Sequence, residues 1–468
     1  MIFLTFSCAG IAEIAEKEIN AAAQKGALVL YFYQPVLNPL DISFVIKNVE
    51  IKKQNGEWIS LSRQPISIRS TDIQGNQVLL AESQLEEGDY EKIRMEVSNP
   101  TFSREEKEIN LTMSQPDNKV EMNIAVSMRA NISAALFLKW FPNKSVASEN
   151  VFRPLITVER QKLSPASVLL YVTNSASNYV SVIDRFENRV VAVIGVEQNP
   201  TGIALSLDKE RLFVLNSGSN SISIIDTSQD FVRDRIQLIS GVGPIEMAIM
   251  PSLDERLNER NEGKLYIANQ GSNDVSVVDI NRKAQINSIT VGNKPLGITA
   301  NPERKEIYVV NSGSNSISII DSQTDTVKKT IDVDTNPLDA VVVNDFLYVL
   351  NGGVNRITLI NLILRKIDGS INVSSNLRNA LFSKQLDRVY LTHYDTSQIS
   401  FLIPSLRAIT RTIDAGVKPM ELAIDETRNS LYVAGHNSNQ IAVIDPISEM
   451  VKKIITVGKN PYGIAFIE

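Results

Sequence analysis

The stretch Val168-Leu-Leu-Tyr-Val-Thr-Asn-Ser-Ala-Ser-Asn-Tyr-Val-Ser-Val-Ile-Asp184 decides the fold, because similar stretches recur through the rest of the chain, giving seven copies. Each copy has an aromatic strand start, an Asn- and Ser-rich turn and a β-branched strand end. The aromatic markers follow one another at steps of 42, 53, 42, 40, 42 and 42 residues, and they are Tyr171, Phe213, Tyr266, Tyr308, Tyr348, Tyr390 and Tyr432. This period, with several short strands in each unit, predicts a β-propeller.

The count of repeats predicts how the ring closes. Innermost strands are expected where a short apolar stretch follows a turn, usually opened by proline, at residues 200, 244, 295, 337, 376, 419 and 461. The first copy has no such strand before Leu169, whereas Gly463–Ile467 ends the chain without a following copy. We therefore expect the C-terminal strand to complete the first blade and to cover an edge that would otherwise stay open.

The four letters Tyr171-Val-Thr-Asn174 carry a family resemblance. Three further copies read Phe213–Asn216, Tyr266–Asn269 and Tyr308–Asn311, and Tyr348–Asn351 is a fourth. Residues 168–468 resemble the YVTN-repeat family of seven-bladed, WD40-like propellers. The resemblance implies the fold and leaves the chemistry open, because propellers include enzymes, ligand-binding proteins and docking platforms.

Residues 27–160 are rich in short Val-, Ile- and Phe-containing runs that polar turns separate, which predicts an all-β sandwich. The expected strands are Leu28–Tyr33, Ile42–Lys52, Ile66–Ile73, Val78–Ala81, Tyr90–Val97, Glu108–Met113, Val120–Val126, Ile132–Phe141 and Phe152–Glu159. Val45–Ile51, Gly56–Trp58 and Gly88–Arg94 resemble a bacterial domain-of-unknown-function family with a transthyretin-like sandwich. That resemblance implies an exported, often lipid-anchored protein. Residues 161–167 are the expected linker.

Residues 1–26 contain the single cysteine of the chain, Cys8, at the end of a short apolar run. Two interpretations stay open. Cys8 is either an incidental residue of an unstructured start, or the acylated cysteine of a truncated signal segment that resembles the lipoprotein box. Thr5 and Phe6 depart from that pattern, and no basic region precedes the run. Residues 9–25 are expected to form a short amphipathic helix or a tether.

Composition limits the partners. Of 468 residues, 47 are basic and 53 acidic, giving a net charge of −6, which argues against nucleic acid as the main partner. No run reaches the roughly 18 apolar residues that a membrane-spanning helix needs. Haem-attachment, phosphate-loop, nucleophile-elbow and zinc motifs are missing, so we expect no cofactor, metal or catalytic set.

Asn- and Ser-rich turns are expected on one face of the ring, together with the loops that lead into the innermost strands. Such residues form turns by default, because they tolerate left-handed backbone and bond to their own main chain. Alternatively they form a polar rim that binds a ligand above the channel, with Lys294, Lys418 and Lys459 adding positive charge. The candidate ligand-binding asparagines are Asn174, Asn178, Asn216, Asn220, Asn269, Asn273, Asn311 and Asn315.

His393 and His436 are the two histidines, and they occupy corresponding turns of the sixth and seventh copies. We expect them to be exposed turn residues, and a metal or proton-transfer pair is the alternative. The recurrent Asp184, Asp226, Asp279, Asp321 and Asp445 are expected to initiate hairpin turns. The charged insertion Leu253–Lys264 is expected to be a solvated loop, with partner docking as the alternative.

These observations predict a two-domain, all-β protein: residues 1–26 as a signal-like segment, 27–160 as a sandwich and 168–468 as a seven-bladed propeller closed by the C-terminal strand. The favoured function is non-enzymatic binding or scaffolding in the bacterial periplasm or at the cell surface. The expected partner is a protein or a glycan, the expected state is a monomer, and a lipid anchor through Cys8 is considered. The alternative is a lactonase-like hydrolase or a redox protein with a site near His393 and His436.

Overall fold

The computed structural model describes residues 25–467, apart from 55, 105–106, 116, 131, 148–149, 162–167, 252–262 and 375–376. Contacts within the chain divide it into two units, Met1–Lys162 with Val191–Gly195, and Leu163–Val190 with Val196–Glu468. Cys8 and almost all of the expected helix at 9–25 lie outside the described residues. So do most of the charged insertion and the expected strand opening at residue 376. Within the described ranges, no helix is both long and apolar enough to cross a bilayer.

The first unit is a β-sandwich, as predicted. One sheet has the strand order β13-β10-β1-β5, formed by β1 (Lys25–Tyr33), β5 (Gln77–Glu86), β10 (Ala134–Trp140) and β13 (Ile156–Arg160). The other has the order β3-β2-β6-β7, with β4 paired to β2 and β9 paired to β6. Its strands are β2 (Ile42–Lys53), β3 (Trp58–Ser62), β4 (Ile66–Arg69), β6 (Gly88–Arg104), β7 (Lys107–Asn110) and β9 (Lys119–Met128). A small third sheet contains β8 (Thr112–Met113), β11 (Val146–Ala147) and β12 (Val151–Phe152), and a 3-10 helix spans Pro142–Lys144.

Strand β2 shows how sequence alternation sets the inner face of the sandwich. Ile42, Phe44 and Ile46 are buried at every second position, and the pattern then moves by one residue to Val49 and Ile51. The register with β6 shifts between Ile46 and Asn48. A bulge of this kind adds one residue to a strand and turns the following side chains to the other face. The apolar residues on both sides of the bulge therefore reach the same core.

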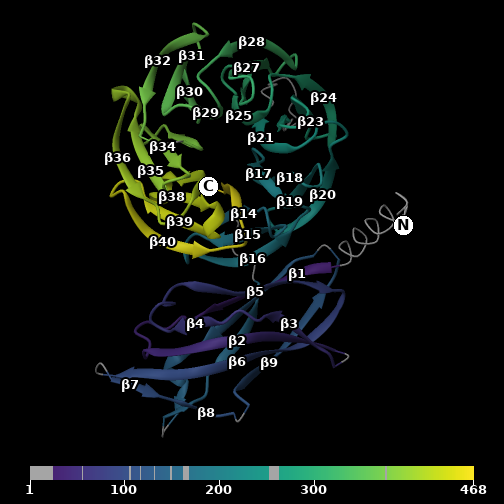
Figure 1. Ribbon diagram of the computed structural model, residues 1–468. Helices are drawn as coiled ribbons and strands as arrows, with labels where there is room; N and C mark the ends of the chain where they lie inside the picture. Colours follow the sequence, from purple (N-terminus) through teal and green to yellow (C-terminus); the bar gives the residue numbers. More distant parts are fainter. Residues whose placement is uncertain are drawn as a thin grey trace, which may run out of the picture. The chain divides into compact units, whose positions relative to one another are not determined.

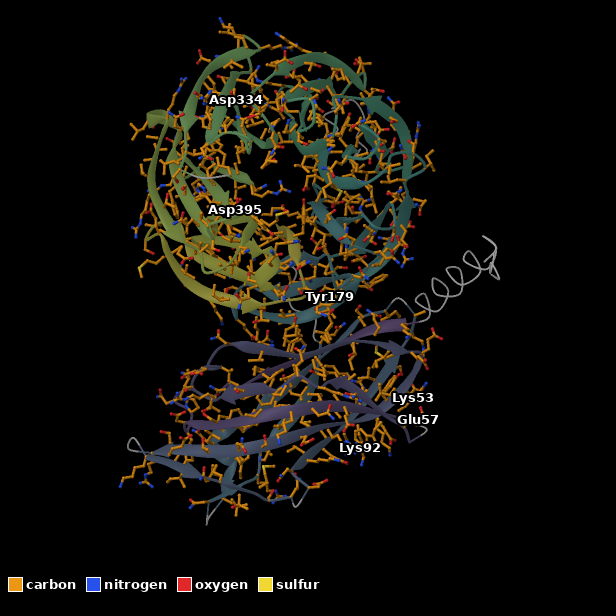
Figure 2. The ribbon with its side chains drawn as sticks, in the orientation of Figure 1. Lys53, Glu57, Lys92, Tyr179, Asp334 and Asp395 are labelled. Atoms are coloured by element: carbon orange, nitrogen blue, oxygen red, sulfur yellow. The ribbon has the colours of Figure 1, made fainter. Side chains whose placement is uncertain are left out.

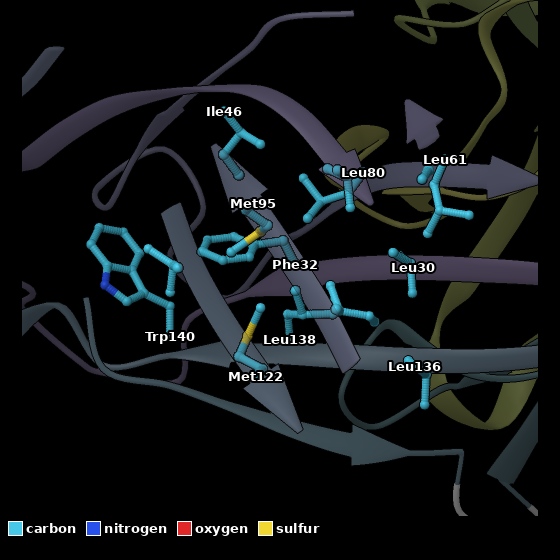
Figure 3. Packing of buried hydrophobic residues seen from close by; sticks show 14 of the residues in the cluster. Leu30, Phe32, Ile46, Leu61, Leu80, Met95, Met122, Leu136, Leu138 and Trp140 are labelled. Atoms are coloured by element: carbon cyan, nitrogen blue, oxygen red, sulfur yellow. The ribbon is translucent and has the colours of Figure 1, made fainter. Parts of the chain in front are cut away.

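Large apolar side chains from both sheets fill the sandwich core (Figure 3). The Trp140 ring lies 5.9 Å from the Phe32 ring and 5.1 Å from the Phe44 ring, between ring centres. Its indole N–H donates to the Ser145 hydroxyl at 2.9 Å, which satisfies the polar edge of a fully buried ring. The sequence did not predict β3, and it predicted only about half of β6. That strand continues beyond Val97 because Asn99 adopts a left-handed conformation at an irregularity in the pairing.

The second unit, together with Val191–Gly195 of β16, contains seven four-stranded antiparallel sheets, the blades of a propeller (Figure 1). The first blade contains β14 (Leu169–Asn174), β15 (Tyr179–Asp184) and β16 (Arg189–Gly195), with a fourth strand from the C-terminus. The second contains β17 (Pro200–Leu205), β18 (Arg211–Asn216), β19 (Ser221–Asp226) and β20 (Phe231–Gln237), and the third β21 (Pro244–Met250), β22 (Lys264–Asn269), β23 (Asp274–Asp279) and β24 (Ala284–Thr290). The fourth contains β25 (Pro295–Asn301), β26 (Glu306–Asn311), β27 (Ser316–Asp321) and β28 (Thr326–Asp332). The last three are β29 (Pro337–Val343), β30 (Phe346–Asn351), β31 (Arg356–Asn361) and β32 (Lys366–Asn372); β33 (Ala380–Ser383), β34 (Arg388–His393), β35 (Gln398–Ile403) and β36 (Ala408–Asp414); and β37 (Pro419–Asp425), β38 (Ser430–Gly435), β39 (Gln440–Asp445) and β40 (Met450–Thr456).

The C-terminal strand closes the ring as predicted. β41 (Pro461–Phe466) pairs antiparallel with β14, with Leu170 opposite Phe466 and Val172 opposite Ile464. Around the axis, each innermost strand contacts the next, and β41 contacts both β17 and β37. Residues from the two ends of the propeller sequence therefore share one sheet, and main-chain hydrogen bonds hold the strand that follows the last blade in the first blade.

A buried ion pair reinforces this closure. The guanidinium of Arg185, in the turn after β15, binds the carboxylate of Asp425 at the end of β37. Their side chains are 2% and 0% exposed. Arg185 also donates to the carbonyl of Ile467 and lies 4.8 Å from the ring centre of Phe466. One cation thus contacts the first blade, the last blade and the closing strand.

The repeated acidic residues at strand ends form turns, as predicted. Asp184 Oδ1 accepts the backbone N–H groups of Phe186 at 2.8 Å and Glu187 at 3.1 Å. Asp226, Asp279, Asp321 and Asp445 make equivalent bonds within their turns, and so does Asn361 in the fifth blade. In the sixth blade Pro404 begins a 3-10 turn instead.

Candidate functional site

The first asparagine of each predicted turn lies inside its blade. Asn174, Asn216, Asn269 and Asn311 are each 0% exposed. Each side-chain amide donates to the hydroxyl of the serine seven residues later, at 2.8 to 2.9 Å. The suggested ligand-binding role is therefore wrong at these four positions, because a fully buried amide offers a ligand no surface. The amide instead joins the second and third strands of its blade.

The second asparagine of the turn stays partly exposed. Asn178, Asn220, Asn273 and Asn315 all have φ between 48° and 60°, the left-handed region that asparagine tolerates well. The side-chain oxygens of Asn178, Asn273 and Asn315 accept the backbone N–H of the residue 21 positions later, at 2.8 to 2.9 Å. These bonds confirm that the turns lie beside the loops leading into the innermost strands. A ligand role at these four residues stays a prediction, as it does for the exposed Lys294, Lys418 and Lys459.

The two histidines have different surroundings. His393 is fully buried, and its Nε2 lies 2.6 Å from the Ser400 hydroxyl, so it takes the place that asparagine holds in other blades. Its predicted exposure is wrong, because His393 is the last residue of the buried strand β34 and the turn begins at the next residue. His436 is partly buried, with its Nδ1 3.3 Å from the carbonyl oxygen of Pro461 and its ring edge-on to Tyr462. His436 thus contacts Tyr462, a residue that lines the axial cavity of the propeller.

The innermost strands provide a second set of polar residues. The third residue of six innermost strands is Gly202, Glu246, Gly297, Asp339, Glu421 or Gly463, in order around the ring. Asn379, just before β33, lies beside Thr392 at the corresponding place in the sixth blade. Glycine is needed beside the acids: a Cβ on Gly202 would lie 2.9 Å from Glu246 Oε1, and a Cβ on Gly297 would lie 2.9 Å from Asp339 Oδ1. The missing side chains make room for the carboxyl groups of the neighbouring strands.

A cavity of about 250 Å³ lies on the propeller axis among these strands. Glu246, Asp339 and Glu421 line it, together with Arg378 and Tyr462. Arg378 Nη2 donates to the Tyr462 hydroxyl at 3.3 Å. Asp339 Oδ2 accepts the Asn379 side-chain amide at 3.0 Å and the Ala380 backbone N–H at 3.2 Å. Figure 2 shows side chains of the ring extending toward its central opening.

Burial and mutual repulsion change the ionisation of these acids. Burial raises the pKa of Glu246 to about 7, and the nearby charge of Asp339 adds to this effect. Burial also raises the pKa of Asp339 to about 6, against the hydrogen bonds that it accepts and the charge of Arg378. The pKa of Glu421 lies well above its ordinary value, through burial and then repulsion by Glu246 and Asp339. At about pH 6 the three acids therefore still hold part of the protons that exposed carboxyl groups would have lost.

One oxygen of this cluster lacks a partner. Glu421 Oε2 is buried and makes no hydrogen bond to any described residue. A buried polar atom without a partner is costly, and in native proteins it commonly marks the place of a water, ion or ligand. No group of three His, Cys, Asp or Glu side chains in the described ranges has an arrangement that could hold a metal ion. The carboxyl groups are thus arranged around a space and do not form a metal-ion site.

The first unit has a larger cavity of about 540 Å³, lined by residues of β6, β9, β10 and β13. Its acidic side chains already have partners: Ser127 donates to Asp89 at 2.5 Å, and Lys52 pairs with Glu91 at 2.9 Å. The axial cavity, with an acid oxygen left unbonded, is the better candidate for a binding site.

Sequence reasoning found no acidic cluster at the axis. The information was present as a break in the repeat: Pro-x-Gly opens the innermost strand at residues 200, 295 and 461, whereas Pro-x-Glu or Pro-x-Asp opens it at 244, 337 and 419. Reading down the aligned copies for the position where glycine alternates with an acid would have identified Glu246, Asp339 and Glu421. No comparable sequence pattern identified Arg378, because the sixth innermost strand lacks the opening proline by which the copies are aligned.

Residues 32–153 match a family described as Domain of unknown function (DUF4382). This match lies within the first unit and agrees with its predicted resemblance to a domain-of-unknown-function family. A comparison with curated proteins gives no match. Membership of the second unit in the YVTN-repeat family stays a prediction.

Solved structures share the propeller fold. A functionally unknown protein from Desulfotomaculum acetoxidans is 14% identical, covering 64% of this chain and 99% of its own, with a TM-score of 0.57. A proposed 6-phosphogluconolactonase from Bacteroides fragilis is 13% identical over 66% of this chain and 100% of its own, with a TM-score of 0.54. The dihydro-heme d1 dehydrogenase NirN, solved in complex with DHE, is 11% identical over 65% of this chain and 76% of its own, with a TM-score of 0.52. At these identities the likeness shows the fold alone.

Proposed function

We propose that this protein is a non-enzymatic binding protein of the bacterial cell envelope, and that its propeller binds the end of a glycan in the axial pocket. The main support for this proposal is that one cavity is lined by Glu246, Asp339, Glu421, Arg378 and Tyr462. The carboxyl groups mainly accept hydrogen bonds, the guanidinium donates, and the phenol does both. A sugar hydroxyl also does both, so a ring bearing several hydroxyl groups complements this mixture.

The size of the cavity supports a small ligand or the tip of a larger one. Its volume of about 250 Å³ is below the roughly 300–1,000 Å³ of sites for drug-sized molecules. One terminal sugar fits such a volume better than a long oligosaccharide. The remainder of a glycan would lie over the face that carries the half-exposed Asn178, Asn220, Asn273 and Asn315.

The envelope location is part of the proposal. It rests on the apolar run before Cys8, on the absence of any other cysteine in the sequence and on the predicted resemblance of residues 27–160 to exported proteins. An anchor through Cys8 would hold the propeller at the outside of a membrane. Mass spectrometry of a precursor expressed in a bacterial host tests this point, since an unmodified Cys8 would refute the anchor.

Glycan binding is tested with an array of bacterial envelope oligosaccharides probed by the intact protein. We expect specific binding that Asp339→Asn weakens about tenfold or more, since a hydrogen bond to a charged group is lost. Glu303→Gln, at an exposed position, is the matched control and should bind normally. Binding that is equal in both variants would place the site elsewhere.

A second candidate is a hydrolase, with its site in the axial pocket and not at a histidine pair. The observation that favours it is the pKa of about 7 for Glu246 beside the pKa of about 6 for Asp339, values suited to general acid–base chemistry near neutral pH. Acid release from sugar lactones would support this candidate if Glu246→Gln abolished it.

A further inference from the structure

The axial pocket has an excess of acidic groups. Among its described lining residues, three carboxyl groups face one guanidinium, that of Arg378. Arg378 stabilises the charged form of each acid, and so lowers the pKa of each, but burial and repulsion outweigh it. Tyr462 also faces the cluster, and the nearby His436 is held towards its neutral form because burial lowers its pKa. The pocket therefore lacks positive charge when its acids are ionised.

The hydrogen bonds show which carboxyl oxygen of the pocket lacks a partner. Asp339 accepts from Asn379 and Ala380, and Glu246 Oε1 accepts the Met247 backbone N–H at 3.3 Å. Arg378 is directed to the Tyr462 hydroxyl at 3.3 Å. Glu421 accepts a backbone hydrogen bond from Ile464, but its Oε2 is buried with no partner among the described residues. A donor is missing beside Glu421.

We infer that the axial pocket selects a ligand that carries a protonated primary amine, which donates to Glu421 and is stabilised by Glu246. Given the proposed function, on which this inference rests, the ligand class is a glycan end with a free amino sugar. An ammonium group supplies both the missing donor and the missing charge, and its three hydrogens can reach more than one carboxyl group. A neutral hydroxyl would supply the donor alone.

The raised pKa values support this reading. Before binding, the acids retain protons because their charges repel one another in a poorly hydrated site. A bound cation favours the ionised forms and displaces those protons. Binding should therefore release protons near neutral pH and strengthen as the pH rises from about 5 to about 7, the range in which Asp339 and Glu246 ionise.

The test compares three sugars by isothermal titration calorimetry at about pH 7, where an aliphatic amine is largely protonated. Glucosamine carries the free amine, N-acetylglucosamine carries it capped, and glucose lacks it. We expect glucosamine to bind about tenfold or more tighter than the other two. Equal or tighter binding of glucose would overturn the amine preference and leave the proposed function intact. No binding of any of the three would overturn both.

Variants connect the preference to its residues. Glu421→Gln keeps the shape of the side chain and should reduce the preference for glucosamine over glucose to about twofold or less, with Glu303→Gln as the matched surface control. Circular dichroism melting checks that Glu421→Gln is folded, and Glu246→Gln provides a second test of the same charge. Titrations in buffers of different ionisation enthalpy measure proton release. Release with glucosamine that persists unchanged in both variants would contradict the inference.

Discussion

Two sets of polar side chains occur around this propeller, and they differ in what surrounds them. The turn asparagines are fully enclosed, and their amide groups donate to serine or threonine hydroxyls within the same blade. The axial acids face a cavity, and one of their oxygens has no partner in the described chain. The asparagines repeat with the blades, whereas the acids interrupt the glycine repeat. Repetition thus marks residues that build the ring, and departure from it marks residues that serve a site.

The ion pair of Arg185 and Asp425 is the strongest member of the structural set, and breaking it should have the largest effect. Arg185→Met leaves the buried Asp425 carboxylate with only the longer 3.6 Å contact to Arg428, so we expect a loss of about 3–5 kcal/mol in unfolding free energy. Denaturant unfolding of the propeller measures this loss. Arg282→Met, at a side chain that is 75% exposed, is the control and should change stability by less than about 0.5 kcal/mol. Similar values for both variants would remove the closure role of Arg185.

Replacing a turn asparagine should lower the stability of the propeller less than breaking the ion pair does, and it should leave ligand binding unchanged. Asn311→Ala removes bonds to Ser316 at 3.2 Å and Ser318 at 2.9 Å, and so takes a donor from the buried Ser318 hydroxyl. We expect a loss of about 1–3 kcal/mol, measured by denaturant unfolding, with unchanged ligand affinity. Asn293→Ala, at an exposed loop position, is the control. A change in affinity without a change in stability would reverse the assignment of the two sets.

Replacing an axial acid should change stability by an amount and in a direction that depend on pH. Glu246 titrates at an ordinary 4.5 when unfolded and at about 7 when folded, so between these values the folded protein keeps a proton that the unfolded chain has lost. Its contribution is therefore favourable at low pH and is lost as the pH rises towards 7. Glu246→Gln should raise the melting temperature at about pH 8 relative to wild type, and leave it nearly equal or slightly lower at about pH 4. Calorimetric melting curves test this, and Glu303→Gln should show no such dependence.

Particular residues show how far sequence reasoning reached. The aromatic markers predicted seven blades, and the unpaired Gly463–Ile467 predicted the closing strand, because both follow from counting copies of one unit. The turn role of Asp184 followed from its local chemistry. The ligand role of Asn174 failed, because a turn sequence does not say whether its first side chain faces solvent or the blade. The predicted exposure of His393, which is fully buried, failed for the same reason.

The sequence by itself determined the architecture, since period, turn residues and β-branched strands act over a few residues and repeat without change. Only the tertiary structure decided the site. Glu246, Asp339 and Glu421 are separated by more than eighty residues at each step, and ring closure places them around one cavity. Their raised pKa values and the unpartnered oxygen of Glu421 come from that enclosure, because desolvation and charge repulsion depend on distances in space and not on positions along the chain.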